Sequence, residues 1–303
     1  MPSTGGIVRM PDDDQLGEME GQAMLDFEVL VAGSFLQHQL CVRYDDQCGR
    51  IPLPPQRAAQ LEQAWVAHTR WTRSNNLEPC NDQLVRLVDL RVNERGSVLH
   101  LELSGTDYRE FVGTRTPDLY DPRDRAQLAN PLGTSAVVIT ADHKILCGRR
   151  PINANINPGR YFLLGGFMTP ADLASPDGLF GGIVREIHEE TGIAPGAHQQ
   201  TYCTGLVYDT QILHPELCFS THVTETFDTI CTYQSQDREV IKLESIDNDP
   251  HSVAGWLMQL HGRQLVGTAE ACLLLHGRLA FGEAWFDTTL SALDALAVEM
   301  ASA

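Results

Sequence analysis

Residues 185–193 read REIHEETGI, and this stretch contains the strongest indication of both fold and function. Glu186, Glu189 and Glu190 are three and four positions apart, so on a helix their carboxylates share one face, which we expect to be exposed. Like charges in that arrangement repel one another unless a cation joins them. Carboxylate oxygens are the ligands that Mg²⁺ and Mn²⁺ prefer. The pattern therefore predicts a divalent-metal site that acts on phosphate groups.

An acidic, solvated helix face is the alternative interpretation, because most clusters of charge are of that kind. The surrounding residues favour the metal site. Apolar side chains recur at helical spacing before the acidic turn, and Gly192 stands where a left-handed C-cap is needed. Gly181 and Gly182 inside the helix indicate a close approach of backbone. Upstream, YFLLGGF at 161–167 predicts a strand that runs into a tight glycine loop beside a bound phosphate.

The acidic helix and the glycine loop resemble the box of the Nudix hydrolases, G-x5-E-x7-R-E-U-x-E-E-x-G-U, in which U is a bulky aliphatic residue. The second half of that box matches residues 185–193 without exception. The resemblance implies that the three Glu residues hold catalytic Mg²⁺ or Mn²⁺. It also implies that Arg185 pairs with a carboxylate and orients it.

The first half of the box departs from the family pattern. Asp177 stands where the family has Glu, and Ala171 stands where it has Gly. Asp177 can still accept a hydrogen bond or cap the helix N-terminus, although its side chain is one methylene shorter. An insertion at 168–175 would allow Gly165 and Gly166 to replace the missing glycine.

A finer resemblance lies upstream of the box. TDYREFVGT at 106–114, ANPLGT at 129–134 and SAVVITADHKILCGRR at 135–150 are similar to the Nudix branch that hydrolyses UDP-glucose and UDP-galactose to UMP and sugar 1-phosphate. Tyr108 and Phe111 either stack on uracil or pack between domains as core aromatics. The substrate-binding residues that we expect on this basis are Arg149, Arg150, Gly165, Gly166, Tyr108 and Phe111.

Three carboxylates are candidates for the general base that activates the attacking water. Glu216 and Glu239 each precede an expected strand, and Glu189 is the third candidate. Three other functions are also open: hydrolysis of ADP-ribose or an ADP-sugar, a non-catalytic nucleotide-binding or regulatory module, and an isopentenyl-diphosphate isomerase. The isomerase would need a reactive Cys, and neither Cys147 nor Cys203 has a sequence context that indicates one.

Composition limits the partners of the chain. Its 303 residues have a formal net charge of −18, with 40 acidic against 22 basic side chains, which opposes binding to a nucleic-acid polymer. A small diphosphate chelated by a metal is compatible with this charge. We expect a cytoplasmic protein without membrane association, either a monomer or a homodimer. No export signal or membrane-spanning run is evident, and the eight cysteines should be reduced thiols.

The order of expected elements predicts an α/β fold of the Nudix type, an α/β/α sandwich around a mixed sheet, preceded by a smaller α+β domain. We expect a flexible tail at 1–23, the N-terminal α+β domain at 24–130 and the Nudix hydrolase domain at 131–303. Within the first domain, a Pro-rich turn precedes a helix at 56–73, and strands at 84–92 and 97–103 form a pair. Three helices, beginning at 252, 269 and 286, close the chain.

Overall fold

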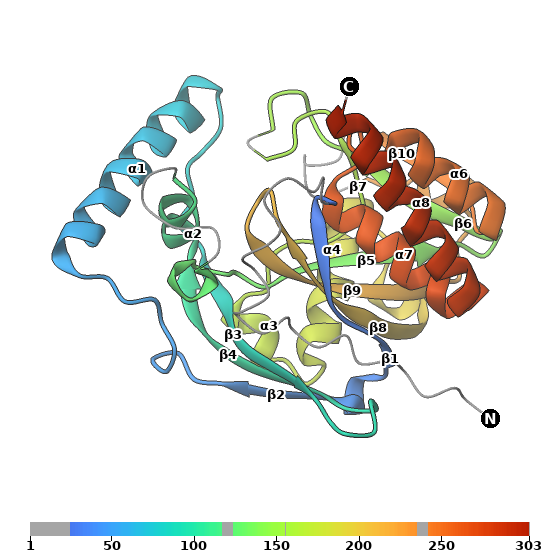
Figure 1. Cartoon of the computed structure of the whole chain (residues 1–303), viewed down its shortest axis with the longest axis horizontal. Coiled ribbons are helices and arrows are strands. Elements are labelled where there is room, and N and C mark those ends of the chain that lie inside the picture. The colour runs from blue at the N-terminus through green and yellow to red at the C-terminus, as the bar shows by residue number, and fades with distance from the viewer. Residues whose placement is uncertain (1–24, 117–123, 155, 235–241, 303) are drawn as a thin grey trace.

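The computed structural model describes residues 25–116, 124–154, 156–234 and 242–302. A mixed sheet lies at its centre (Figure 1), with the strand order β1-β8-β9-β5-β6-β10 and the short β7 paired with β6. Only β5 and β9 run parallel, and every other pair in this sheet is antiparallel. The strands are β1 (Phe27–Phe35), β5 (Gly133–Ile139), β6 (Lys144–Arg149), β7 (Tyr161–Phe162), β8 (His198–Asp209), β9 (His214–Val223) and β10 (Lys242–Asp247).

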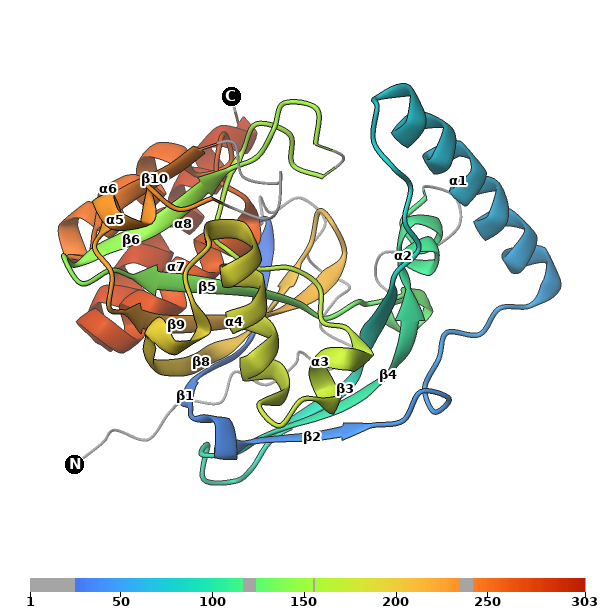
Figure 2. The ribbon, with the colours of Figure 1, turned by 180° about the vertical axis from the view of Figure 1, so that it is seen from behind.

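Helices cover both faces of this sheet. Alternate side chains of β5 therefore pack into two different apolar cores. Ala136 and Val138 belong to one apolar core with Ile183 of α4 (Gly178–Thr191). Val137 and Ile139 belong to a second core, which the helices α6, α7 and α8 complete. These helices span Pro250–Leu260, Gly267–Phe281 and Glu283–Ser302, and they lie together on the face away from α4 (Figures 1 and 2). The predicted α/β/α sandwich with a mixed sheet is confirmed.

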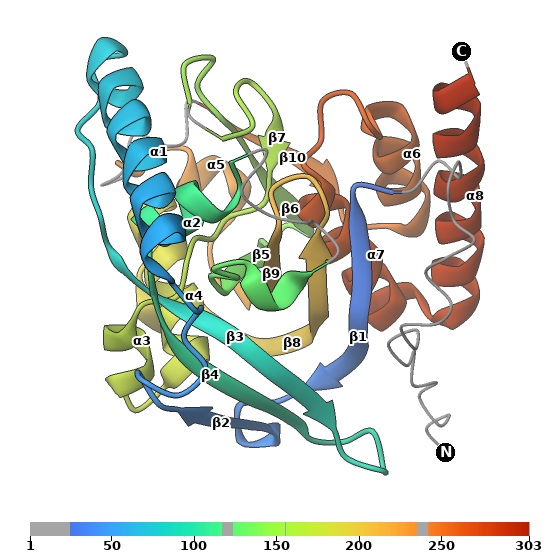
Figure 3. The ribbon, with the colours of Figure 1, turned by 60° about the vertical axis from the view of Figure 1, so that its left-hand side comes forward.

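A second, three-stranded sheet has the order β2-β4-β3, from Leu40–Tyr44, Leu99–Asp107 and Gln83–Val92. The helices α1 (Pro55–Ser74) and α2 (Tyr108–Thr114) lie beside it at the side of the molecule (Figure 3). They meet closely, because a Cβ added to Gly113 would lie 2.3 Å from Leu61 Cγ. The predicted helix at 56–73 and the strand pair at 84–92 and 97–103 are thus both present.

The two sheets are joined by hydrogen bonds along β3. The Val85 amide donates to the Met168 carbonyl, and the Leu132 amide donates to the Val85 carbonyl. β1 lies in the predicted N-terminal domain by sequence but pairs with β8 of the large sheet. The predicted boundary near residue 130 remains a prediction, and the predicted tail at 1–23 lies outside the described residues.

The expected strand at 161–167 is short for a structural reason. Only Tyr161 and Phe162 pair with β6, after which the chain crosses to β5 and forms isolated bridges through Leu164 and Phe167. This change of partner interrupts a regular ladder. The remaining helical pieces are α3 (Pro170–Ala174), α5 (Phe227–Ile230) and the 3₁₀ turns Gln37–Gln39, Arg125–Gln127 and Pro195–Ala197. Among the described residues, no helix combines the length and apolarity that a membrane span requires.

Candidate active site

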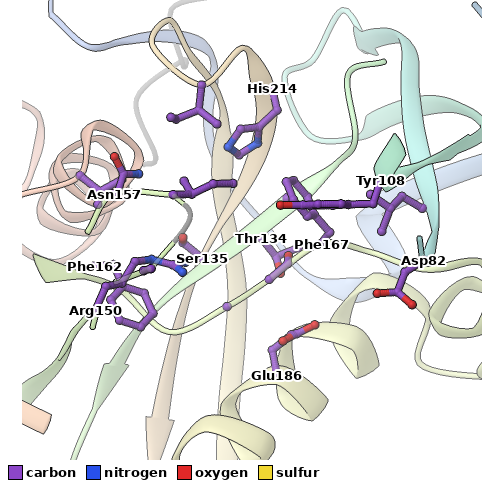
Figure 4. Close-up of a pocket in the computed structure, with 18 of the residues that line it drawn as sticks. Asp82, Tyr108, Thr134, Ser135, Arg150, Asn157, Phe162, Phe167, Glu186 and His214 are labelled. Atoms are coloured by element: carbon purple, nitrogen blue, oxygen red, sulfur yellow. The ribbon is translucent and has the colours of Figure 1, made fainter. Parts of the chain in front are cut away.

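A cavity of about 690 Å³ lies between the α1/α2 side of the molecule and the large sheet. Its size is typical of sites that enclose most of a small ligand. In Figure 4, Thr134 and Ser135 stand between Glu186 on one side and His214 on the other. Lining residues that bear on function are His68, Asp82, Tyr108, Gly133, Thr134, Ser135, Arg150, Asn153, Asn157, Phe162, Gly165, Gly166, Phe167, Arg185, Glu186, Glu189, His214, Glu216 and Thr268.

The acidic helix forms one wall of this cavity. Phe180, Ile183 and Ile187 of α4 are buried against the sheet, which fixes the direction of the acidic turn. The helix ends at Gly192, whose φ of 78° is the predicted left-handed cap. A Cβ added to Gly182 would lie 2.6 Å from Met168 Sδ, so the predicted close approach is made by the loop before the helix.

The three carboxylates have different environments. Glu186 and Glu189 line the cavity, and their side chains are 15% and 38% exposed. Glu190 is 3% exposed and accepts a hydrogen bond of 3.0 Å from the Gly165 amide. The expectation that Glu186 and Glu190 lie on an exposed face is wrong for Glu190, and Glu186 is only partly exposed. The glycine loop packs against both carboxylates, which buries Glu190 and leaves Glu186 partly open to the cavity.

One positively charged side chain, Arg185, pairs with the carboxylates of this wall. Arg185 donates hydrogen bonds of 2.8 Å to Glu186 and 2.8 Å to Glu189. Burial nevertheless raises the pKa of Glu186 to about 7, against the opposing influence of Arg185. The Glu186 carboxylate is therefore poorly compensated as an anion and would be stabilised by a further positive charge.

Arg185 also binds a carboxylate that the sequence interpretation missed. It donates from Nε to Asp172 Oδ1 at 2.8 Å and from Nη2 to Asp172 Oδ2 at 3.0 Å. Asp177 has no such role, because it is exposed and its only described side-chain contact is a 3.5 Å hydrogen bond from Gln37. It also makes no side-chain cap on α4. Counting six positions forward from Gly166, across five intervening residues, would have identified Asp172, with the insertion placed after it.

The glycine loop fits tightly into the site. A Cβ added to Gly165 would lie 1.9 Å from the Thr134 carbonyl oxygen, and Gly165 has a φ of 152°. A Cβ added to Gly166 would lie 2.6 Å from Glu186 Oε2. Gly165 requires glycine because backbone occupies the space of a side chain, whereas a side chain at position 166 would displace the Glu186 carboxylate.

The opposite wall contains buried polar groups. Glu216, one of the three candidates for the general base, is 6% exposed and accepts a hydrogen bond from the Ser135 hydroxyl. His214 Nε2 lies 3.7 Å from Glu216 Oε2. Burial raises the pKa of Glu216 and lowers that of His214. Glu239, another of these candidates, lies outside the described residues.

An aromatic cluster lies beside these polar groups. Tyr108 lines the cavity and packs against His68 and Phe111, with ring centroids 5.7 Å and 5.8 Å away. Phe111 is completely buried, behind Phe167, and does not line the cavity. The structure thus places Tyr108 where a ligand can reach it and Phe111 in the core.

The two predicted arginines also differ in position. Arg150 lines the cavity, and its guanidinium lies 4.5 Å from the centre of the Phe162 ring. Arg149 is exposed, does not line the cavity and donates to the Gly159 carbonyl oxygen at 3.2 Å. Of the predicted pair, only Arg150 is in a position to contact a ligand in this cavity.

The chemistry of this wall fits a divalent cation. Glu186 and Glu189 supply hard oxygen donors at the cavity surface, and the buried Glu186 carboxylate is poorly compensated. Within the described ranges, no three His, Cys, Asp or Glu side chains form a metal-binding group. The predicted third ligand, Glu190, accepts a hydrogen bond from the glycine loop instead of facing the cavity with Glu186 and Glu189. All eight cysteines are free.

Comparison with known proteins gives one informative relative. The Arabidopsis thaliana protein named Nudix hydrolase 9 is 32% identical over 121 residues, a match that covers 31% of this chain and 39% of the relative. The chain thus matches about two-fifths of that protein's length. No family model matches the chain.

Solved structures resemble the chain only distantly. A MutT protein from Methanosarcina mazei Go1 is 17% identical with a TM-score of 0.34, and the match covers 50% of this chain and 94% of that one. A Nudix hydrolase from Nitrosomonas europaea is 15% identical with a TM-score of 0.35, and that match covers 48% and 87%. Structural similarity at this level does not place a chain in a family. The similarity to the Arabidopsis thaliana protein is therefore the comparison that supports a relationship to the Nudix hydrolases.

Proposed function

We propose that this protein is a metal-dependent diphosphatase that hydrolyses a nucleoside diphosphate sugar, UDP-glucose or UDP-galactose, to UMP and sugar 1-phosphate. The observation that carries the proposal is the meeting of the Glu186 and Glu189 carboxylates with the Gly165–Gly166 loop at one cavity wall. Acidic donors beside a backbone loop without side chains suit a diphosphate that arrives with a cation.

The choice of a UDP-sugar is supported by the position of the segments that resemble the UDP-sugar branch, because residues from these segments line the cavity. Tyr108 of the 106–114 segment and Gly133 and Thr134 of the 129–134 segment all line the cavity. An aromatic side chain there offers a surface for a nucleobase. The cavity volume of about 690 Å³ is also large enough for a ligand with a base, two phosphates and a sugar.

In this mechanism Glu186 and Glu189 would hold Mg²⁺ or Mn²⁺, and Arg185 orients both carboxylates through its two hydrogen bonds to them. The cation, when bound, neutralises charge on the phosphate oxygens and lowers the pKa of a water. The Gly165–Gly166 backbone leaves room for the diphosphate, and Arg150 stands at the cavity as a phosphate-binding cation. Water adds to one phosphorus, the bridging P–O bond breaks, and two phosphomonoesters leave.

A panel of nucleoside diphosphate conjugates with Mg²⁺ tests this proposal. Chromatography identifies the nucleotide monophosphate released. UMP from UDP-glucose, abolished by EDTA and restored by Mg²⁺, is the expected result. Release of AMP from ADP-ribose or an ADP-sugar instead would reassign the substrate. Binding of UDP without turnover of any conjugate would indicate a non-catalytic module.

Variants test the metal-binding wall separately. Glu186→Gln and Glu189→Gln remove one charge each and should lower kcat by about 10²-fold or more, because oxygen donors to the cation are lost. The matched control is Glu94→Gln, which changes an exposed glutamate in the turn between β3 and β4. Wild-type rates in both active-site variants would overturn the assignment of this wall.

A further inference from the structure

The wall opposite the acidic helix contains a pair of hydrogen-bond acceptors that the metal-binding and phosphate-binding roles proposed above do not use. His214 and Glu216 lie at the start of β9, are 7% and 6% exposed, and both line the cavity. His214 Nε2 and Glu216 Oε2 are 3.7 Å apart, which is too far for a direct hydrogen bond. Because both residues line the cavity, a ligand that supplies hydrogen-bond donors can reach them.

The tautomer of His214 follows from its other nitrogen. Nδ1 lies 3.2 Å from the Pro215 carbonyl oxygen, which can only accept, so Nδ1 carries the proton. Burial lowers the pKa of His214, and the imidazole is therefore uncharged near neutral pH. Nε2 is then an acceptor, and it lies on the side of the ring that faces Glu216 Oε2.

Glu216 presents a second acceptor beside it. The Ser135 hydroxyl donates to Oε1, and Thr268 also donates to this carboxylate. Oε2 is the oxygen that faces His214. The other charged groups near the pair are Asp209, Arg115 and Arg150, so acidic and basic neighbours are both present.

The geometry of the pair is fixed by its surroundings. The His214 ring packs edge-on against Phe167 and Phe111, with centroids 5.2 Å and 6.0 Å away. Gly133 on the neighbouring strand leaves space for both side chains, since a Cβ there would lie 3.1 Å from His214 Cε1 and 3.2 Å from Glu216 Oε2. Two adjacent, rigidly held acceptors are therefore presented to the cavity.

We propose that His214 and Glu216 bind two neighbouring hydroxyl groups of one sugar ring of the substrate. A vicinal diol supplies two adjacent donors to two adjacent acceptors, whereas a phosphate has only acceptors here and would be repelled. Carboxylate recognition of a ribose hydroxyl follows the same chemistry in dinucleotide sites. The diol belongs either to the ribose or to the hexose of the substrate. This inference rests on the proposed function, because that proposal supplies the nucleoside diphosphate sugar as the substrate.

Deoxygenated substrates test the proposal. KM is measured with UDP-glucose, with its 2′-deoxyuridine analogue and with UDP-2-deoxyglucose, for wild type, Glu216→Gln and His214→Phe. Loss of the recognised hydroxyl should raise the wild-type KM about three- to tenfold, the effect of one hydrogen bond. In at least one of the two variants, the ratio of KM for that deoxy analogue to KM for UDP-glucose, here called the penalty, should fall towards one. The penalty for the analogue that lacks a hydroxyl on the other ring should stay unchanged. The ring whose penalty disappears is the ring bound by the pair.

Matched controls lie nearby on the same chain. His222→Phe makes the same change at an exposed position near the end of β9, and Glu225→Gln changes a half-buried carboxylate just beyond it. Both should keep wild-type penalties for both analogues. Equal penalties in wild type and both active-site variants would overturn the diol proposal, even if UDP-glucose is hydrolysed.

A binding measurement separates failure of this inference from failure of the proposed function. Calorimetric titration with UMP, 2′-deoxyuridine monophosphate, glucose 1-phosphate and 2-deoxyglucose 1-phosphate requires no turnover. Loss of discrimination between one deoxy pair in Glu216→Gln supports the diol site even if no conjugate is hydrolysed. Tight binding of Mg²⁺ that depends on His214 and Glu216 would instead show that the pair is a cation site.

Discussion

Asp172 and Arg185 form a two-point ion pair, with both carboxylate oxygens within 3.0 Å of guanidinium nitrogens. Asp172 is 6% exposed and is held in turn by the Thr169 amide and hydroxyl, at 2.9 Å and 2.8 Å. Because a planar guanidinium matches a carboxylate in this geometry, the pair fixes the orientation of Arg185. Arg185 then holds Glu186 and Glu189, so the short helix α3 before α4 helps to set the geometry of the acidic wall.

The first prediction compares Asp172→Asn with Asp177→Asn. Asp172→Asn keeps the side-chain shape but removes the charge that holds Arg185, so we expect a loss of about 1–3 kcal/mol in the free energy of unfolding and a fall in kcat. Asp177→Asn should change neither quantity by a measurable amount. Urea unfolding and steady-state kinetics check both. Equal effects of the two substitutions would show that Asp172 has no special role.

Much of the fold and part of the site follow from local sequence. The acidic helix, its apolar face and its glycine cap are set by residues within a few turns of one another, so spacing alone predicted them. The strand pair of β3 and β4 is local in the same sense. Gly165 and Gly166 were also predictable, because two adjacent glycines after an apolar strand indicate a tight loop.

Other features depend on contacts between residues far apart in sequence. The burial of Glu190 arises from the Gly165 amide, 25 residues earlier, and no helical periodicity reveals it. Glu216 acquires its environment from Ser135, 81 residues away, through the parallel pairing of β5 and β9. The pairing of β1 with β8 is likewise non-local, so the sequence did not indicate that residues 27–35 join the large sheet. Asp172 was missed because an insertion shifted the spacing of the motif.

The second prediction contrasts two adjacent glycines. Gly165→Ala forces a Cβ into the Thr134 carbonyl at a φ of 152°, so we expect a loss of about 2–4 kcal/mol in the free energy of unfolding. Gly166→Ala meets the end of the Glu186 side chain, which can move, so activity should fall more than stability. Gly196→Ala has open space and is the control. Thermal unfolding with parallel kinetics distinguishes the three, and a fully active Gly166→Ala variant would argue against the placement of Glu186.

The third prediction concerns Tyr108 as a surface for the nucleobase. Tyr108→Leu removes the ring and should weaken inhibition by UMP about three- to tenfold without affecting inhibition by glucose 1-phosphate. Tyr108→Phe keeps the ring and should behave like wild type. Inhibition constants for both products provide the measurement. A variant that weakens both products equally would indicate a structural role in the contact with His68 and Phe111 instead.

The fourth prediction concerns pH and a buried pair that does not line the cavity. His261 Nδ1 lies 2.7 Å from Glu270 Oε2, where α6 ends and α7 begins, and the two residues are 5% and 1% exposed. The hydrogen bond with Glu270 raises the pKa of His261 above its usual 6.5, against the effect of burial, and Asp26 and Asp294 act in the same direction as Glu270. A raised folded-state pKa means that the pair stabilises the protein fully below pH 6.5. This contribution is lost as the pH rises through the folded-state value.

Glu270→Gln tests this dependence because it keeps a hydrogen-bond acceptor and removes the charge. The free energy of unfolding should fall by about 1–3 kcal/mol at pH 6, where His261 is protonated. The difference should shrink towards pH 9, where the wild-type protein buries a carboxylate beside a neutral imidazole. Glu283→Gln, which removes a 57% exposed partner of Arg278, should show a small difference that does not vary over this range. Urea unfolding at pH 6, 7, 8 and 9 provides the comparison, and a constant difference for Glu270→Gln would mean that His261 does not titrate in this window.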